Sequence, residues 1–280
     1  RCIHSRYLLR PSPRTNAIVI GALARALKRY EVKLFGVCFM SNHYHLLLSS
    51  KNAGALAGFM QYIGSNIARE IGRMHRWREK FWSRRYRASA VLDAAAQQDR
   101  MRYILSNSVK EGLVKHPRYW PGVHCYRHLV ERTPLSGGWI DRTALSRHPG
   151  ASESEFTTRY QIQLDILPCF DDLSDSEYRQ TIRALADEAV AGCDDVVKFI
   201  GQKKILAQEP LASPEQTNRS PAPLCHSGCS QLKREFISAF RDFVAAYKQA
   251  YQRVMTSGLA LEFPPGSLPP TAWSGSLTPT

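Results

Sequence analysis

The chain has 280 residues, which is enough for one large domain or two modest ones, and no run of eighteen or more apolar residues predicts a membrane-spanning helix. Its net charge of +14 is uneven: residues 1–130 hold 23 Lys and Arg against 6 Asp and Glu, whereas residues 131–280 hold 15 against 18. The positive excess in the first half favours a module that binds a polyanion such as nucleic acid, joined to an ordinary globular partner. A basic face kept only for solubility is the alternative.

The first 75 residues predict the order strand, helix, strand, strand, helix. Residues 1–9 alternate enough to favour a strand, and residues 12–30 predict a helix with one apolar side. Residues 31–40 and 43–49 predict two further strands. In residues 50–75 the apolar side chains recur three and four positions apart, which is typical of an amphipathic helix.

The next segments complete the predicted fold of the first domain. Residues 77–92 are rich in aromatic residues and arginine and predict a β-hairpin or strand pair. Asp93 is then expected to cap a helix that ends at Gly112. This order predicts an α+β fold of ferredoxin-like type, with an antiparallel sheet and helices on one face, in a domain that spans residues 1–130.

Residues 131–280 predict a mainly α-helical extension. Residues 174–191 predict a helix with a Ser174/Glu177 capping box, and residues 230–258 predict a long amphipathic helix. Residues 207–229 are rich in Pro and Ser and predict a linker, and a Pro-rich tail follows the last helix. This half shows no chemistry of its own, so we expect it to serve interaction, for example with the sheet of the first domain, a nucleic-acid hairpin or a protein partner.

Two histidines lie one residue apart where the third predicted strand begins. Side chains alternate between the faces of a strand, so His43 and His45 are expected on the same face. Two neutral imidazoles side by side can chelate one divalent metal ion, although two ordinary surface histidines remain the alternative. A metal site that stays open to substrate also needs another ligand.

The candidate for that ligand lies on the helix after the basic segment. Tyr103 and Asn107 are four residues apart and so share one helical face. A tyrosine hydroxyl can act as a covalent nucleophile, and an asparagine carbonyl can ligate a hard metal ion. The alternative makes Tyr103 a core aromatic and Asn107 a C-terminal cap.

Residues 73–87 interleave cations with aromatic rings, the combination that binds single-stranded nucleic acid through its phosphates and bases. Trp82 fits a core position equally well. Arg6 near the N-terminus extends the predicted surface. The candidate nucleic-acid-binding residues are Arg6, Arg73, Arg76, Trp77, Arg78, Lys80, Arg84, Arg85 and Arg87.

Four motifs, taken in order, resemble those of the HUH single-strand DNA nucleases with one catalytic tyrosine. More narrowly, the chain is similar to the REP-associated tyrosine transposases, relatives of the single-tyrosine insertion-sequence transposases. The motifs, which lie within residues 1–130, are MSNHYHLLL (40–48), FWSRRYRASAVL (81–92), YILSNSVKEGLV (103–114) and HPRYWPGVHCYRHL (116–129). Ser108 departs from the pattern, since many relatives have a proline after the asparagine.

The resemblance implies a role for each matched residue. His43, His45 and Asn107 would bind Mg²⁺ or Mn²⁺, and Tyr103 would attack a phosphodiester to form a 5′-phosphotyrosine. The implied partner is single-stranded DNA beside short hairpins, cut and rejoined by a metal-dependent endonuclease and strand transferase. The resemblance leaves a monomer or a dimer open and favours the monomer. A location in the bacterial cytoplasm, at the nucleoid, is expected.

Three other functions stay open at this point. A domesticated, repressor-like protein would bind nucleic acid without turnover, and an RNA-directed nuclease would use the same residues. A zinc protein built on Cys225, His226 and Cys229 ranks last, because a zinc site needs four ligands and no second pair is evident.

Overall fold

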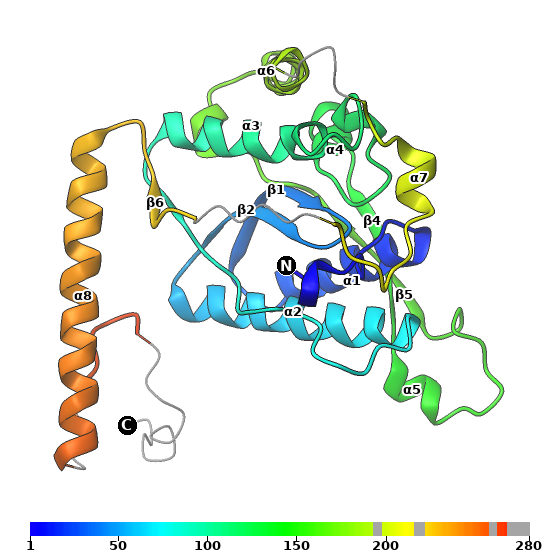
Figure 1. Cartoon of the computed structure of the whole chain (residues 1–280), viewed down its shortest axis with the longest axis horizontal. Coiled ribbons are helices and arrows are strands. Elements are labelled where there is room, and N and C mark those ends of the chain that lie inside the picture. The colour runs from blue at the N-terminus through cyan, green and yellow to red at the C-terminus, as the bar shows by residue number, and fades with distance from the viewer. Residues whose placement is uncertain (193–197, 216–221, 258–261, 268–280) are drawn as a thin grey trace.

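The computed structural model describes residues 1–192, 198–215, 222–257 and 262–267 (Figure 1). Its centre is an antiparallel hairpin of β1 (Val32–Phe39) and β2 (Tyr44–Ser50), in which Cys38 lies opposite His45. The other edge of β1 pairs with residues 123–125, since the amides of Phe39 and Cys125 donate to Val123 and Val37, each over 2.8 Å. β1 is therefore an internal strand, and most of its residues are buried.

Three helices enclose this hairpin. α1 (Pro13–Leu27) and α2 (Ala53–Met74) lie on one side of it, and α3 (Ala94–Lys110) lies on the other (Figure 1). Each begins at a side-chain cap, from Ser12, Asn52 and Asp93 respectively. The α+β class and the cap at Asp93 are confirmed, and the hairpin is covered on both faces rather than on one.

The predicted first strand is wrong. Cys2 forms only an isolated bridge with Trp82, and the following Ile3–Ser5 is a turn of 3-10 helix, η1. His4 and Ser5 adopt φ values of 49° and 55°, which interrupt an extended chain.

The predicted hairpin over residues 77–92 is also wrong. Only β3 (Ala90–Val91) is a strand, and it pairs in parallel with the distant β6 (Cys225–His226). Trp82 of this segment packs against α2 instead, where its indole N–H donates to the Gly64 carbonyl over 2.8 Å. Trp82 is therefore a packing residue.

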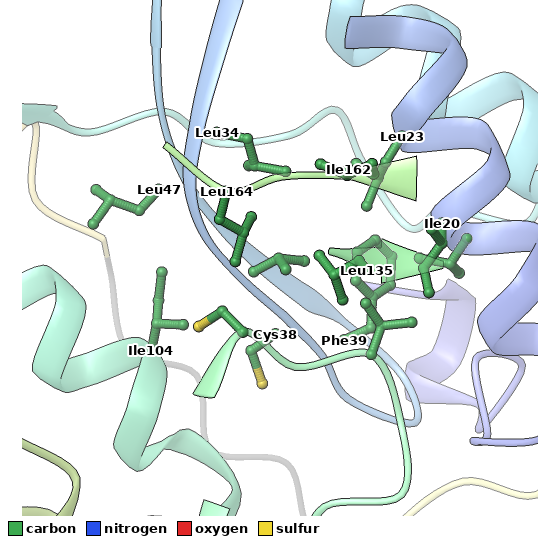
Figure 2. Packing of buried hydrophobic residues seen from close by; sticks show 14 of the residues in the cluster. Ile20, Leu23, Leu34, Cys38, Phe39, Leu47, Ile104, Leu135, Ile162 and Leu164 are labelled. Atoms are coloured by element: carbon green, nitrogen blue, oxygen red, sulfur yellow. The ribbon is translucent and has the colours of Figure 1, made fainter. Parts of the chain in front are cut away.

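The second half begins with a hairpin that the sequence did not predict. β4 (Leu135–Ile140) and β5 (Thr157–Ile162) pair antiparallel and pack against α1. The contact depends on glycine, because a Cβ on Gly21 would lie 2.3 Å from the Gly138 carbonyl oxygen. Leu135, Ile162 and Leu164 join the buried cluster around β1 (Figure 2). One buried core thus contains residues from both sides of position 130. The domain boundary at this position stays a prediction.

The remaining elements are mostly helical. α6 (Asp175–Ala191) begins at the predicted Ser174/Glu177 capping box and packs on α3 and on α4 (Tyr126–Glu131). α8 (Ser230–Ser257) is the predicted long helix and stands beside the body (Figure 1). The short elements are η2 (Pro117–Tyr119), α5 (Arg142–Ser146), η3 (Pro168–Phe170) and α7 (Gln202–Leu206). Among the described residues, no helix is long and apolar enough to cross a membrane.

The described parts of the predicted linker lie against the first domain. The amide of Tyr7 donates to the Ala212 carbonyl over 3.0 Å, and the Ser41 hydroxyl donates to Gln208 over 2.6 Å. Further along, the amides of Ala90 and Leu92 donate to the carbonyls of Leu224 and His226, each over 3.0 Å. The segment therefore contacts both the turn before the histidine pair and the chain that leads into α3.

Candidate active site

The two histidines lie together at the start of β2. His43 is the last residue of the turn between β1 and β2, and His45 is the second residue of β2. Their ring centroids are 5.0 Å apart, with the ring planes at 88°. Burial lowers the pKa of His43 to about 2 and that of His45 to about 4. Both imidazoles are therefore neutral at physiological pH, the form that ligates metal ions.

Asn42 fixes the orientation of His43. Its Nδ2 donates to the Ser5 carbonyl over 3.0 Å, which turns its Oδ1 toward His43 Nδ1 at 2.6 Å. Because an amide oxygen only accepts, His43 Nδ1 carries the proton and Nε2 keeps a free lone pair. The sequence analysis missed Asn42, although an asparagine directly before a candidate ligand was the available signal.

The helix α3 brings the predicted nucleophile to this pair. The Tyr103 ring lies edge-on to the His45 ring, with centroids 5.2 Å apart. Asn107 lies one turn further along α3 and is only 3% exposed. It is inside the helix, whose C-cap is Glu111, so the interpretation of Asn107 as a cap is wrong.

Two atoms that could ligate a metal ion, one on β2 and one on α3, are left without hydrogen-bond partners. His45 Nε2 and Asn107 Oδ1 are both buried and make no hydrogen bond. An unpaired buried polar atom is costly unless a ligand satisfies it. Neutral imidazole nitrogens and an amide oxygen can all ligate a divalent cation, so the residues present are chemically able to hold one. Elsewhere in the described part of the chain, no group of three or more His, Cys, Asp or Glu could hold a metal, including around Cys225.

Two cations flank the Tyr103 ring. Arg100 Cζ lies 5.2 Å from the ring centroid and Lys110 Nζ lies 5.8 Å from it. Arg102, on the same helix, forms ion pairs with Asp99 and with Glu188, the latter at 3.4 Å. Within the described residues neither Arg100 nor Lys110 has such a carboxylate partner.

The predicted nucleic-acid-binding residues divide into two groups. Arg73 is paired with Glu70 at 2.8 Å, and Arg6 stacks over the Trp77 ring at 5.2 Å while it donates to the Leu211 carbonyl. The others are exposed and, among the described residues, have no carboxylate partner: Arg76, Arg78, Lys80, Arg84, Arg85 and Arg87. These six keep their charge available to a polyanion.

A buried histidine next to this region makes the stability of the protein depend on pH. Burial lowers the pKa of His124 from 6.5 to about 4. Between these values the unfolded chain binds a proton that the folded chain does not, so stability falls as pH falls below 6.5. At pH 5 the loss is roughly 2 kcal/mol. His124→Gln is therefore expected to shrink, by about that amount, the difference in unfolding free energy between pH 7 and pH 5.

Urea unfolding at the two pH values measures this difference. The exposed His148, changed to Gln, is the control and should leave the difference as it is in the parent protein. An unchanged difference in His124→Gln would show that His124 is not held neutral by the fold.

Comparison with known proteins gives one match. Residues 13–107 match the sequence model of the family described as "Transposase IS200 like", a stretch that runs from the start of α1 to Asn107. The match includes both histidines and Tyr103, so this stretch of the chain is similar to IS200-like transposases. No curated protein and no solved structure matches the chain.

Proposed function

We propose that this protein is a metal-dependent endonuclease and strand transferase that cuts single-stranded DNA at hairpin-flanked sites through a 5′-phosphotyrosine at Tyr103. One observation carries the proposal: the Tyr103 ring contacts His45, whose Nε2 is buried and unpartnered, and Asn107, one turn further along α3, also has a buried and unpartnered Oδ1. The match of residues 13–107 to IS200-like transposases supports the same chemistry. Among these relatives, the motifs quoted above favour a REP-associated transposase that works as a monomer.

Three side chains would hold the cation. They are His43 and His45, each through Nε2, and Asn107 through Oδ1. When bound, Mg²⁺ or Mn²⁺ supplies positive charge to a non-bridging oxygen of the scissile phosphate. Asn42 keeps His43 in the tautomer that leaves Nε2 free, and burial keeps both rings neutral.

Tyr103 would carry out the bond exchange. Its oxygen attacks the phosphorus and loses its proton, a new P–O bond to tyrosine forms, and the bond to the 3′-oxygen breaks. The strand leaves with a free 3′-hydroxyl, and the phosphotyrosine keeps the energy of the phosphodiester. A 3′-hydroxyl of another strand can reverse the step, so joining needs no ATP.

The exposed cations of residues 76–87 would bind the DNA backbone. Neutralising Arg84, Arg85 and Arg87 together to Gln is expected to reduce the slope of log affinity against log salt concentration by about 2, since each phosphate contact on a single strand contributes about 0.7. Binding titrations at several salt concentrations measure the slope. The exposed Arg241 of α8, changed to Gln, is the control, and a reduction of about 0.7 there, the same amount per charge, would show that only net charge matters.

A covalent-adduct assay tests the proposed function. The protein is incubated with Mn²⁺ and labelled single strands copied from the DNA that flanks its own gene, and the products are separated on a denaturing gel. A slowly migrating protein–DNA adduct is expected. Tight, salt-sensitive binding without any adduct would instead indicate a repressor-like binding protein, and an adduct formed equally on all-ribose strands would indicate an RNA-directed nuclease.

A further inference from the structure

We infer that Arg100 and Lys110 form a phosphate clamp on α3 that holds the DNA backbone on either side of the phosphate that Tyr103 attacks. This inference deepens the proposed function and rests on it. The clamp consists of these two residues alone. Lys110 lies within the motif of residues 103–114, but neither residue was assigned a role from the sequence.

The first argument is their placement. Arg100, Tyr103, Asn107 and Lys110 follow one another at intervals of three, four and three residues, so they form one stripe along α3. The stripe reaches over about 15 Å of helix axis. From the two ends of this stripe, both cations turn back onto the Tyr103 ring, at 5.2 Å and 5.8 Å. Their charge is therefore concentrated at the nucleophile.

The second argument is that, among the described residues, neither cation is paired with a carboxylate. Arg100 Nε is buried and makes no hydrogen bond, although a guanidinium has five donors to satisfy. In the described chain no carboxylate pairs with Arg100 or Lys110, whereas Arg102 between them has Asp99 and Glu188. A phosphate is the anion that arginine binds best, through paired N–H donors.

The third argument concerns what surrounds the two cations. Burial is the main cause of the lowered pKa of the nearby His226, and the positive charge of Arg100 lowers it further. The carboxylate of Asp99, which also acts on His226, is already paired with Arg102. An incoming phosphate is the group that completes this arrangement.

The test measures coupling between each cation and one phosphate. Binding is measured with the full-length Tyr103→Phe protein, which cannot cleave, using single strands copied from the DNA that flanks the gene. Each strand carries one neutral methylphosphonate, directly before or directly after the cleavage position or, where no cleavage is seen, at one of the two phosphates whose modification weakens binding most. Arg100→Gln and Lys110→Gln should each weaken binding to the natural strand about tenfold, as expected for the loss of one charge-assisted hydrogen bond. On one of the two methylphosphonate strands, each substitution should have almost no further effect.

Arg102→Gln is the matched control, since it removes the same charge from the same helix. It should bind natural and methylphosphonate strands with the affinities of its parent. Arg100→Lys should recover part of the affinity, which a purely structural role of the guanidinium would not give. The clamp would be overturned if the affinity lost through each substitution were the same on the natural strand and on both methylphosphonate strands. It would also be overturned if Arg102→Gln lost as much affinity as Arg100→Gln and Lys110→Gln.

The proposed nuclease and the clamp can fail separately. If wild-type protein forms no covalent adduct but the coupling is present, the nuclease proposal fails and the clamp stands as a binding device. If the adduct forms but the coupling is absent, the nuclease stands and the clamp is wrong. In single-turnover assays at saturating protein, Arg100→Gln should also slow adduct formation, because the phosphate is then less well placed for attack.

Discussion

Tyr103→Phe is expected to abolish the covalent adduct, with a loss of at least about ten-thousandfold in its rate of formation, while affinity for the same single strand stays within about twofold. The substitution removes the one oxygen that attacks phosphorus. It keeps the aromatic ring that contacts His45, Arg100 and Lys110, so the surroundings of the site are preserved. Adduct formation on denaturing gels and affinity by titration measure the two quantities.

Tyr119→Phe is the control for this prediction. Tyr119 is 47% exposed, and its ring lies against Arg118 and His116 rather than the histidine pair. It should form the adduct as the parent protein does. An adduct that survives in Tyr103→Phe would mean that another residue is the nucleophile, and lost binding would mean that the hydroxyl serves DNA recognition.

The second large effect is expected at the metal ligands. His45→Ala should slow adduct formation by about a thousandfold and should weaken Mn²⁺ binding, because its Nε2 is one of the donors that the fold leaves without a protein partner. Titration of Mn²⁺ by electron paramagnetic resonance measures the binding without relying on catalysis. His148→Ala, at an exposed position on another part of the surface, should change neither quantity.

The pH behaviour of His45 sharpens this prediction. Burial sets its pKa at about 4, so the ring stays neutral from pH 8 down to about pH 5. Mn²⁺ binding should therefore not fall steeply through pH 6.5, as it would for an ordinary surface histidine pair. Unchanged Mn²⁺ binding in His45→Ala would remove the histidine pair from the proposed site.

The elements that could be predicted from the sequence are those with local signals. The helices α2 and α3 have apolar residues at helical spacing and side-chain caps at Asn52 and Asp93. The capping box at Ser174 is equally local. Such signals act within a few residues and do not depend on how the chain folds elsewhere.

The elements that were wrong or missed depend on distant partners. Residues 77–92 have the composition of a hairpin, yet their backbone binds residues near the N-terminus and the segment at 224–226. The β4–β5 hairpin contains Gly137 and Gly138, which resemble a loop until α1 packs against them. Partners this far away along the chain leave no trace in local spacing.

The candidate site shows the same division. Strand alternation was enough to place His43 and His45 together, and helical spacing was enough to place Tyr103 with Asn107. That the strand and the helix meet follows from tertiary packing, in which Ile104 and Leu47 line the same buried region (Figure 2). The role of Asn42 and the two cations at the Tyr103 ring follow only from that packing.

The most direct measurement is mass spectrometry of the adduct after nuclease and trypsin digestion. Cleavage after Arg102 and Lys110 releases the peptide Tyr103–Lys110, which contains one tyrosine and two serines. We predict that fragmentation places a 5′-linked nucleotide on Tyr103 and that the released strand ends in a 3′-hydroxyl. A nucleotide on Ser106, Ser108 or a residue outside this peptide, or a strand that ends in a 3′-phosphate, would contradict the proposed chemistry.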